Sequence, residues 1–108
     1  MKVTFFKDVF DKNAPHHVNV TTALDRIKTG QSKTTIDAVR SGDKSAKKKL
    51  PVVCFSGEFA SRSDDALFEH SGILVLDFDH IDVAQAKSAL ATDAHVYSCW
   101  VSPSGDGL

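Results

Sequence analysis

The distribution of apolar residues along the chain predicts four β-strands. Runs rich in Val, Ile, Phe and Tyr have the length of strands, and turn-forming or charged residues bound them. The predicted strands are residues 2–6, 51–56, 73–79 and 94–101. Residues 73–79 give the clearest prediction, because four consecutive aliphatic residues precede two acids.

Short helices are predicted between these strands, because apolar residues at helical spacing follow residues that can cap a helix. The predicted caps are Thr22, Ser32, Asp43, Ser63 and Asp82. Residues 7–20 are expected to be irregular, and residues 57–62 to form a turn or loop. A helix between the strands at 73–79 and 94–101 predicts a right-handed crossover that joins parallel strands.

These elements indicate an α/β (α+β) fold with a mixed sheet of about four strands. The length of 108 residues suits a single domain spanning residues 1–108. Helices predicted within residues 21–50 form an insert after the first strand.

Hydropathy and cysteine content limit the cellular compartments in which the protein is expected. No apolar run approaches the roughly 20 residues of a membrane span, and the N-terminal residues lack the apolar core of a signal peptide. The two cysteines, Cys54 and Cys99, form neither a metal motif nor a disulfide framework. A reducing, cytoplasmic location without membrane contact is therefore expected.

The net charge of −1 conceals an uneven distribution of charge. Residues 21–50 hold eight Lys and Arg against three Asp, whereas residues 51–108 hold nine acids against Arg62 and Lys87. A basic segment of this kind is either a solvated helical surface or a binding surface for a polyanion. In the second case, Lys44, Lys47 and Lys48 are expected to contact the backbone of a nucleic acid.

The pair Asp77 and Asp79 is the main candidate for chemistry. Residues two positions apart on a strand share a face and lie about 6.5 Å apart, so the two carboxylates can converge on one or two cations. Carboxylate oxygens are suited to Mg²⁺ or Mn²⁺, which can support phosphoryl or nucleotidyl transfer. Acid pairs at strand ends are also common without a metal. His80 is expected to face the opposite side of the strand.

The sequence SPSGDGL, residues 102–108, follows the last predicted strand. Gly105 and Gly107 permit positive φ angles and close backbone approach, while Ser102 and Ser104 add hydroxyl groups. Such a turn can hold a phosphate with its amide groups, although a plain solvent-exposed turn has the same composition. If the last two strands are parallel neighbours, this turn and the two acids meet at one edge of the sheet.

Three blocks together, LPVVCFSGEFASR, HSGILVLDFDHID and SCWVSPSGDGL, resemble the VirE N-terminal-domain family, which is related to the archaeo-eukaryotic primase (primase–polymerase) superfamily. The resemblance covers about residues 50–108. It implies an RNA-recognition-motif-like core and a role in mobile-element replication, often beside a helicase-like ATPase. It also implies that Asp77 and Asp79 bind catalytic metal, and that the turn binds nucleotide phosphates through Ser102, Ser104, Gly105 and Gly107.

Departures from that pattern predict an incomplete site. The resemblance places a basic residue after Leu108 and a third acid on a later strand, so the printed chain is expected to be an inactive N-terminal fragment. A strand left open could pair with a second copy. Arg62 is a further candidate for contact with phosphate.

Three functions follow as hypotheses. The first is a metal-dependent primase–polymerase-type nucleotidyltransferase that uses nucleoside triphosphates and nucleic acid. The second is a non-catalytic nucleic-acid-binding or regulatory module. The third is a haloacid-dehalogenase-like phosphatase with Asp77 as nucleophile, and it is disfavoured because Ile81 stands where that family expects Thr or Val.

Overall fold

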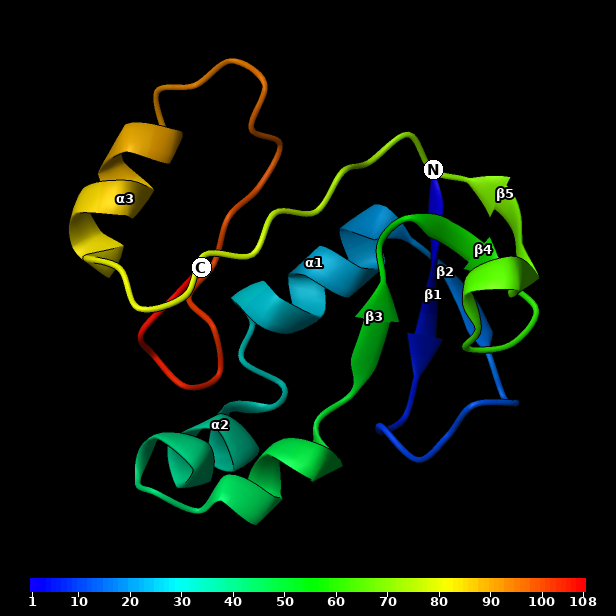
Figure 1. Ribbon diagram of the computed structural model, residues 1–108, viewed down its shortest axis with the longest axis horizontal. Helices are drawn as coiled ribbons and strands as arrows, with labels where there is room; N and C mark the ends of the chain where they lie inside the picture. Colours follow the sequence, from blue (N-terminus) through cyan, green and yellow to red (C-terminus); the bar gives the residue numbers. More distant parts are fainter. The chain divides into compact units, whose positions relative to one another are not determined.

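The computed structural model describes residues 1–108, which form two units. Unit 1 is Met1–Val75 and unit 2 is Leu76–Leu108. Helices and antiparallel strands both occur, and all five strands belong to unit 1 (Figure 1). The prediction of an α+β fold is therefore confirmed at this general level.

Unit 1 is built around a three-stranded antiparallel sheet with the order β2–β1–β3. The strands are β1 (Lys2–Phe6), β2 (His16–Asn19) and β3 (Val52–Cys54). The central strand β1 contributes the fully buried side chains Val3, Thr4 and Phe6. Strands were correctly predicted at residues 2–6 and 51–56, but the predicted mixed sheet of about four strands is wrong.

A second sheet consists of β4 (Gly57–Phe59) and β5 (Leu67–His70), paired antiparallel. The predictions of a turn at residues 57–62 and of a helix capped by Ser63 are therefore wrong, apart from the short 3₁₀ helix η2 (Asp64–Ala66), which Ser63 precedes without a capping bond. Leu67 and Phe68 fit helical and strand patterns equally well, and pairing with β4 decides between them. A Cβ on Gly57 would lie 2.0 Å from the Glu69 carbonyl oxygen, so glycine permits this pairing.

The buried Thr4 hydroxyl connects the two sheets of unit 1. Thr4 Oγ1 donates a hydrogen bond to the Gly57 carbonyl oxygen and accepts one from the Phe59 amide, each at 2.8 Å. Both donor and acceptor capacities of a buried hydroxyl are thereby satisfied.

Three helical segments follow β2: α1 (Val20–Lys28), α2 (Lys33–Arg40) and the 3₁₀ helix η1 (Lys44–Lys49). The predicted cap Asp43 is confirmed, because its side chain accepts hydrogen bonds from the amides of Ser45 and Ala46. Ser32 occupies the predicted cap position of α2 but makes no capping bond. No helix of the chain has the length and apolar character needed to cross a membrane.

Unit 2 contains one helix, α3 (Val83–Leu90), which Asp82 caps through the Gln85 amide as predicted. Residues 73–79 and 94–101 form no strand, so the predicted parallel crossover is wrong. Both runs have the composition of strands, but a strand also requires a hydrogen-bonding partner. The side chains of Leu74, Val75 and Leu76 remain exposed.

Candidate functional site

The C-terminal turn of unit 2 pairs with the segment that carries the two acids. Phe78 donates its amide to the Leu108 carbonyl oxygen and accepts from the Leu108 amide, both at 3.0 Å. A third bond runs from the Ile81 amide to the Asp106 carbonyl oxygen at 3.1 Å. Figure 1 shows the red C-terminal loop beside the yellow segment that leads into α3. The turn and the acids thus lie together, although no parallel sheet brings them there.

The two glycines of this turn have different physical roles. Gly105 has a φ of 87°, a left-handed conformation that favours glycine. Gly107 is buried, and a Cβ there would lie 2.1 Å from the Phe78 carbonyl oxygen. Ser102 closes the turn, because its amide donates to the Gly107 carbonyl oxygen at 2.8 Å and its own carbonyl oxygen accepts from the Gly105 amide at 3.0 Å.

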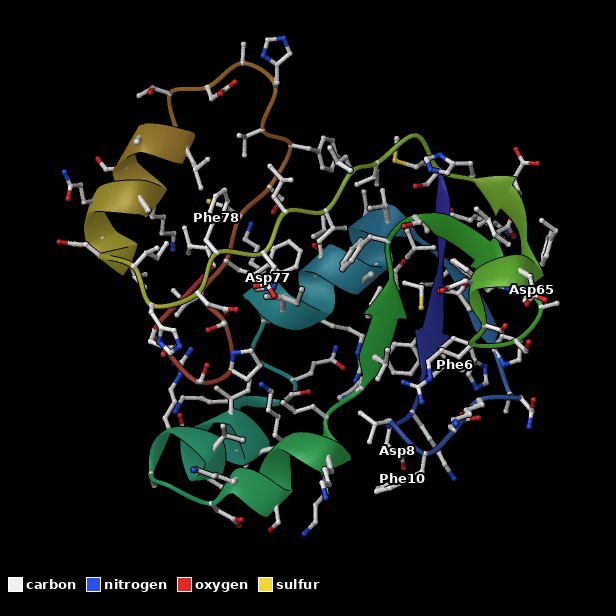
Figure 2. The ribbon with its side chains drawn as sticks, viewed as in Figure 1. Phe6, Asp8, Phe10, Asp65, Asp77 and Phe78 are labelled. Atoms are coloured by element: carbon white, nitrogen blue, oxygen red, sulfur yellow. The ribbon has the colours of Figure 1, made fainter.

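Asp77 and Asp79 are exposed on either side of Phe78 in the chain, and neither takes part in a hydrogen bond or ion pair. Figure 2 shows Asp77 and Phe78 leaving this segment in opposite directions. No group of three or more His, Cys, Asp or Glu side chains is arranged to hold a metal ion. Two free carboxylates nevertheless fit Mg²⁺, which commonly takes one or two carboxylates and completes its shell with water and phosphate oxygens.

The structure reveals a side-chain network in this turn that the sequence did not predict. His80 Nδ1 lies 2.8 Å from Asp106 Oδ2, and the Ser104 hydroxyl donates to Asp106 Oδ1 at 3.0 Å. The Ser102 and Ser104 hydroxyl oxygens are 3.3 Å apart. The hydrogen bond from Ser104, together with the nearby His80, lowers the pKa of Asp106 below its ordinary value.

No sequence signal identified this network. Strand alternation assigned His80 to the face opposite the acids, but the residue has a left-handed backbone with a φ of 54°. Asp106 stands between two glycines and looks like an ordinary turn residue.

Arg62 belongs to unit 1, where part of its side chain already forms a hydrogen bond. Its guanidinium Nη2 donates to the Val9 carbonyl oxygen, and its amide donates to the Lys12 carbonyl oxygen at 2.8 Å. The buried Nε has no hydrogen-bond partner. These contacts hold the loop after β1 against the loop after β4.

The lysines of η1 project from a segment that two buried side chains anchor. Ala46 and Leu50 are buried, while Lys44, Lys47 and Lys48 are exposed and form no ion pair. Lys33 on α2 differs, because its ammonium group lies 2.6 Å from an Asp37 carboxylate oxygen. Lys44, Lys47 and Lys48, three of the four lysines of η1, therefore present positive charge without an ion-pair partner.

Comparison with known protein families assigns the chain to one of them. Residues 45–108, more than half of the chain, match the family model of the BT4734-like N-terminal domain, and the chain belongs to this family. The resemblance to the VirE N-terminal-domain family and the primase superfamily is thereby corrected, because the matching family is a different one. No curated protein and no solved structure matches the chain significantly.

Proposed function

We propose that unit 2 binds a nucleoside triphosphate together with Mg²⁺ or Mn²⁺, within a domain that acts in nucleic-acid replication. The observation that carries the proposal is the pairing of Phe78 with Leu108. It brings a turn rich in glycine and serine against a segment with two free carboxylates, Asp77 and Asp79.

In this proposal the turn binds the phosphates and the two aspartates bind the metal ion. Ser104 is exposed and its amide has no acceptor within the chain, so this amide is available to phosphate oxygens. Asp77 and Asp79 supply the hard oxygen ligands that a divalent ion requires. A bound ion would neutralise triphosphate charge and acidify an attacking hydroxyl, which is the chemistry of nucleotidyl transfer.

Calorimetric titration of the protein with Mn²⁺, alone and with a nucleoside triphosphate, tests the proposal. Asp77→Asn and Asp79→Asn keep the side-chain size but remove a charge, and each is expected to weaken Mn²⁺ binding about tenfold or more. Asp93→Asn removes an exposed charge elsewhere in unit 2 and should leave the affinity unchanged. Equal Mn²⁺ affinity in all four proteins would contradict the metal site.

A second candidate, a non-catalytic nucleic-acid-binding module, is favoured by the unpaired lysines of η1. Exposed lysines without a carboxylate partner can replace the counterions of a phosphate backbone. The RNA-recognition-motif-like core remains a prediction for this module, and the antiparallel β2–β1–β3 sheet is the feature that supports it.

Binding of a fluorescent single-stranded oligonucleotide at several salt concentrations tests this candidate. Each of Lys44→Gln, Lys47→Gln and Lys48→Gln should weaken binding and reduce the slope of log K against log salt by about 0.7. Lys33→Gln is the matched control, because Lys33 is already paired with Asp37. If the control weakens binding as much as the three variants, the effect reflects overall charge and this surface is not the binding site.

A further inference from the structure

A chain of hydrogen-bonded side chains in unit 2 ends at the exposed imidazole of His80. Ser104 Oγ donates to Asp106 Oδ1 at 3.0 Å, and Asp106 Oδ2 lies 2.8 Å from His80 Nδ1. The backbone is fixed at the same place, because the Ile81 amide donates to the Asp106 carbonyl oxygen. The His80 side chain is 85% exposed, so the imidazole is held at Nδ1 and open to solvent at Nε2.

The carboxylate of Asp106 determines which nitrogen of His80 carries the proton. The lowered pKa of Asp106 keeps this group ionised near neutral pH, and an ionised carboxylate only accepts hydrogen bonds. His80 Nδ1 must therefore be the donor. In the neutral imidazole, Nε2 then carries a lone pair and is a hydrogen-bond acceptor. A ligand that meets this nitrogen must bring an O–H or N–H group.

We propose that His80 Nε2 accepts a hydrogen bond from a sugar hydroxyl of the nucleotide whose phosphates the turn binds; this inference rests on the proposed function. The phosphates of a nucleoside triphosphate are largely ionised near neutral pH and offer few O–H groups. The ribose hydroxyls are the nearest O–H donors to these phosphates, whereas the amino groups of the base are farther away. His80 Nε2, an acceptor that the Asp106 carboxylate orients beside the turn, is therefore suited to a hydroxyl group of the sugar.

If His80 had a purely structural role, a residue such as glycine would suit its position better. His80 is the only non-glycine residue with a positive φ, a conformation that costs free energy and that glycine adopts without strain. A second histidine–aspartate pair provides a comparison. His95 Nδ1 lies 3.2 Å from Asp93 Oδ1, but these residues are two positions apart in one local turn and make no hydrogen bond to residues 102–108.

Two measurements on the whole chain test the inference. ¹⁵N NMR of the histidine rings should show that the neutral imidazole of His80 carries its proton on Nδ1. Calorimetry should show that the magnesium complex of ATP binds about five- to tenfold tighter than that of 2′,3′-dideoxy-ATP, the gain expected for about one hydrogen bond. His80→Phe should abolish this preference and retain affinity for magnesium-bound inorganic triphosphate. His95→Phe is the matched control and should change neither affinity.

The possible outcomes separate this inference from the proposed function. If magnesium triphosphate does not bind the wild-type chain, both are overturned. If it binds but His80→Phe keeps the preference for ATP, or the spectrum shows the Nε2–H form, this inference alone is overturned. If the Phe variant folds poorly, His80→Gly provides the same binding test, because glycine adopts a φ of 54° without strain.

Discussion

Gly107 shows how a single missing Cβ permits the contact on which the candidate site depends. The two hydrogen bonds between Phe78 and Leu108 require that the backbone at Gly107 approach the Phe78 carbonyl group closely. The φ of Gly107 is outside the left-handed region, so its requirement is purely steric. Gly105 represents the other case, in which backbone conformation and not space favours glycine.

Gly107→Ala should therefore open the turn. A Cβ placed 2.1 Å from the Phe78 carbonyl oxygen forces the two segments apart, at a cost of about 1–3 kcal/mol in the free energy of this pairing. Amide hydrogen exchange should become faster at Phe78 and Leu108. Gly42→Ala is the control: it strains a φ of 106° but meets no atom within 4 Å, so exchange at those two amides should not change.

The Asp106 carboxylate gives unit 2 a predictable response to acid. Its pKa is lowered, first by the Ser104 hydroxyl and then by His80. A lowered pKa means that the ionised form stabilises the folded state. This contribution is therefore complete above the ordinary value of 3.8 and is lost as the pH falls through the lowered pKa.

Ser104→Ala should raise the pKa of Asp106 toward 3.8, because it removes the main hydrogen bond to the carboxylate. The side-chain carboxyl ¹³C resonance of Asp106, followed from pH 7 to pH 2, measures the change. Ser88→Ala, on α3, provides a control that should leave the titration curve unaltered. A curve that is the same in wild type and Ser104→Ala would show that the hydroxyl does not stabilise the ionised form.

At the scale of elements, two of the five predicted caps make a capping hydrogen bond, and strand pairing was not predicted. The caps Asp43 and Asp82 were correctly predicted, because capping needs only a carboxylate that accepts hydrogen bonds from amides a few residues later in the chain. By contrast, β2, β4 and β5 were missed, because residues 7–20 were expected to be irregular, while residues 73–79 and 94–101 were wrongly predicted as strands. These outcomes depend on which distant segment supplies hydrogen bonds, and apolar periodicity does not encode that choice.

The candidate site shows the same division between local and distant information. The composition of residues 102–107 indicated the need for glycine, and the structure shows the positive φ of Gly105 and the close approach at Gly107. The contact between His80 and Asp106 joins residues 26 positions apart in the numbering, and no spacing rule predicts it. A left-handed backbone at His80 also violates the strand alternation that was assumed there.

Asp43→Ala should unwind η1. Asp43 Oδ1 accepts from the amides of Ser45 and Ala46 and from the Ser45 hydroxyl, so removal of the carboxylate should destabilise the first turn of η1. Backbone chemical shifts of residues 44–49 measure the loss of helical structure. Ser32→Ala is the matched control, because Ser32 precedes α2 without a capping bond; equal perturbation of the two helices would argue against the capping role of Asp43.

At the scale of the whole molecule, the two units differ in charge and in burial. Unit 1 carries twelve Lys and Arg against nine Asp and Glu, whereas unit 2 carries Lys87 against five Asp. The buried apolar side chains, including Val3, Phe6 and Phe55, all belong to unit 1. In unit 2, Gly107 is the only buried residue. Unit 2 thus has little core of its own to stabilise it.

Native-state hydrogen exchange should reflect this difference. Amides of α3 should exchange faster than those of β1, because local opening of unit 2 exposes little additional apolar surface. Addition of Mg²⁺ and a nucleoside triphosphate should slow exchange in unit 2 and leave β1 unchanged, since a ligand stabilises the form that binds it. Slower exchange in both units, or in neither, would contradict ligand binding confined to unit 2.

The position of Asp106 inside the glycine-containing turn also bears on ligand selectivity. A loop made only of amides and hydroxyls attracts any oxyanion, whereas this one includes a carboxylate that repels them. A free polyphosphate therefore meets like charge from Asp106 as well as from Asp77 and Asp79. Complexation with a divalent cation cancels part of that repulsion, so the turn is expected to discriminate against uncomplexed nucleotides even when these are abundant.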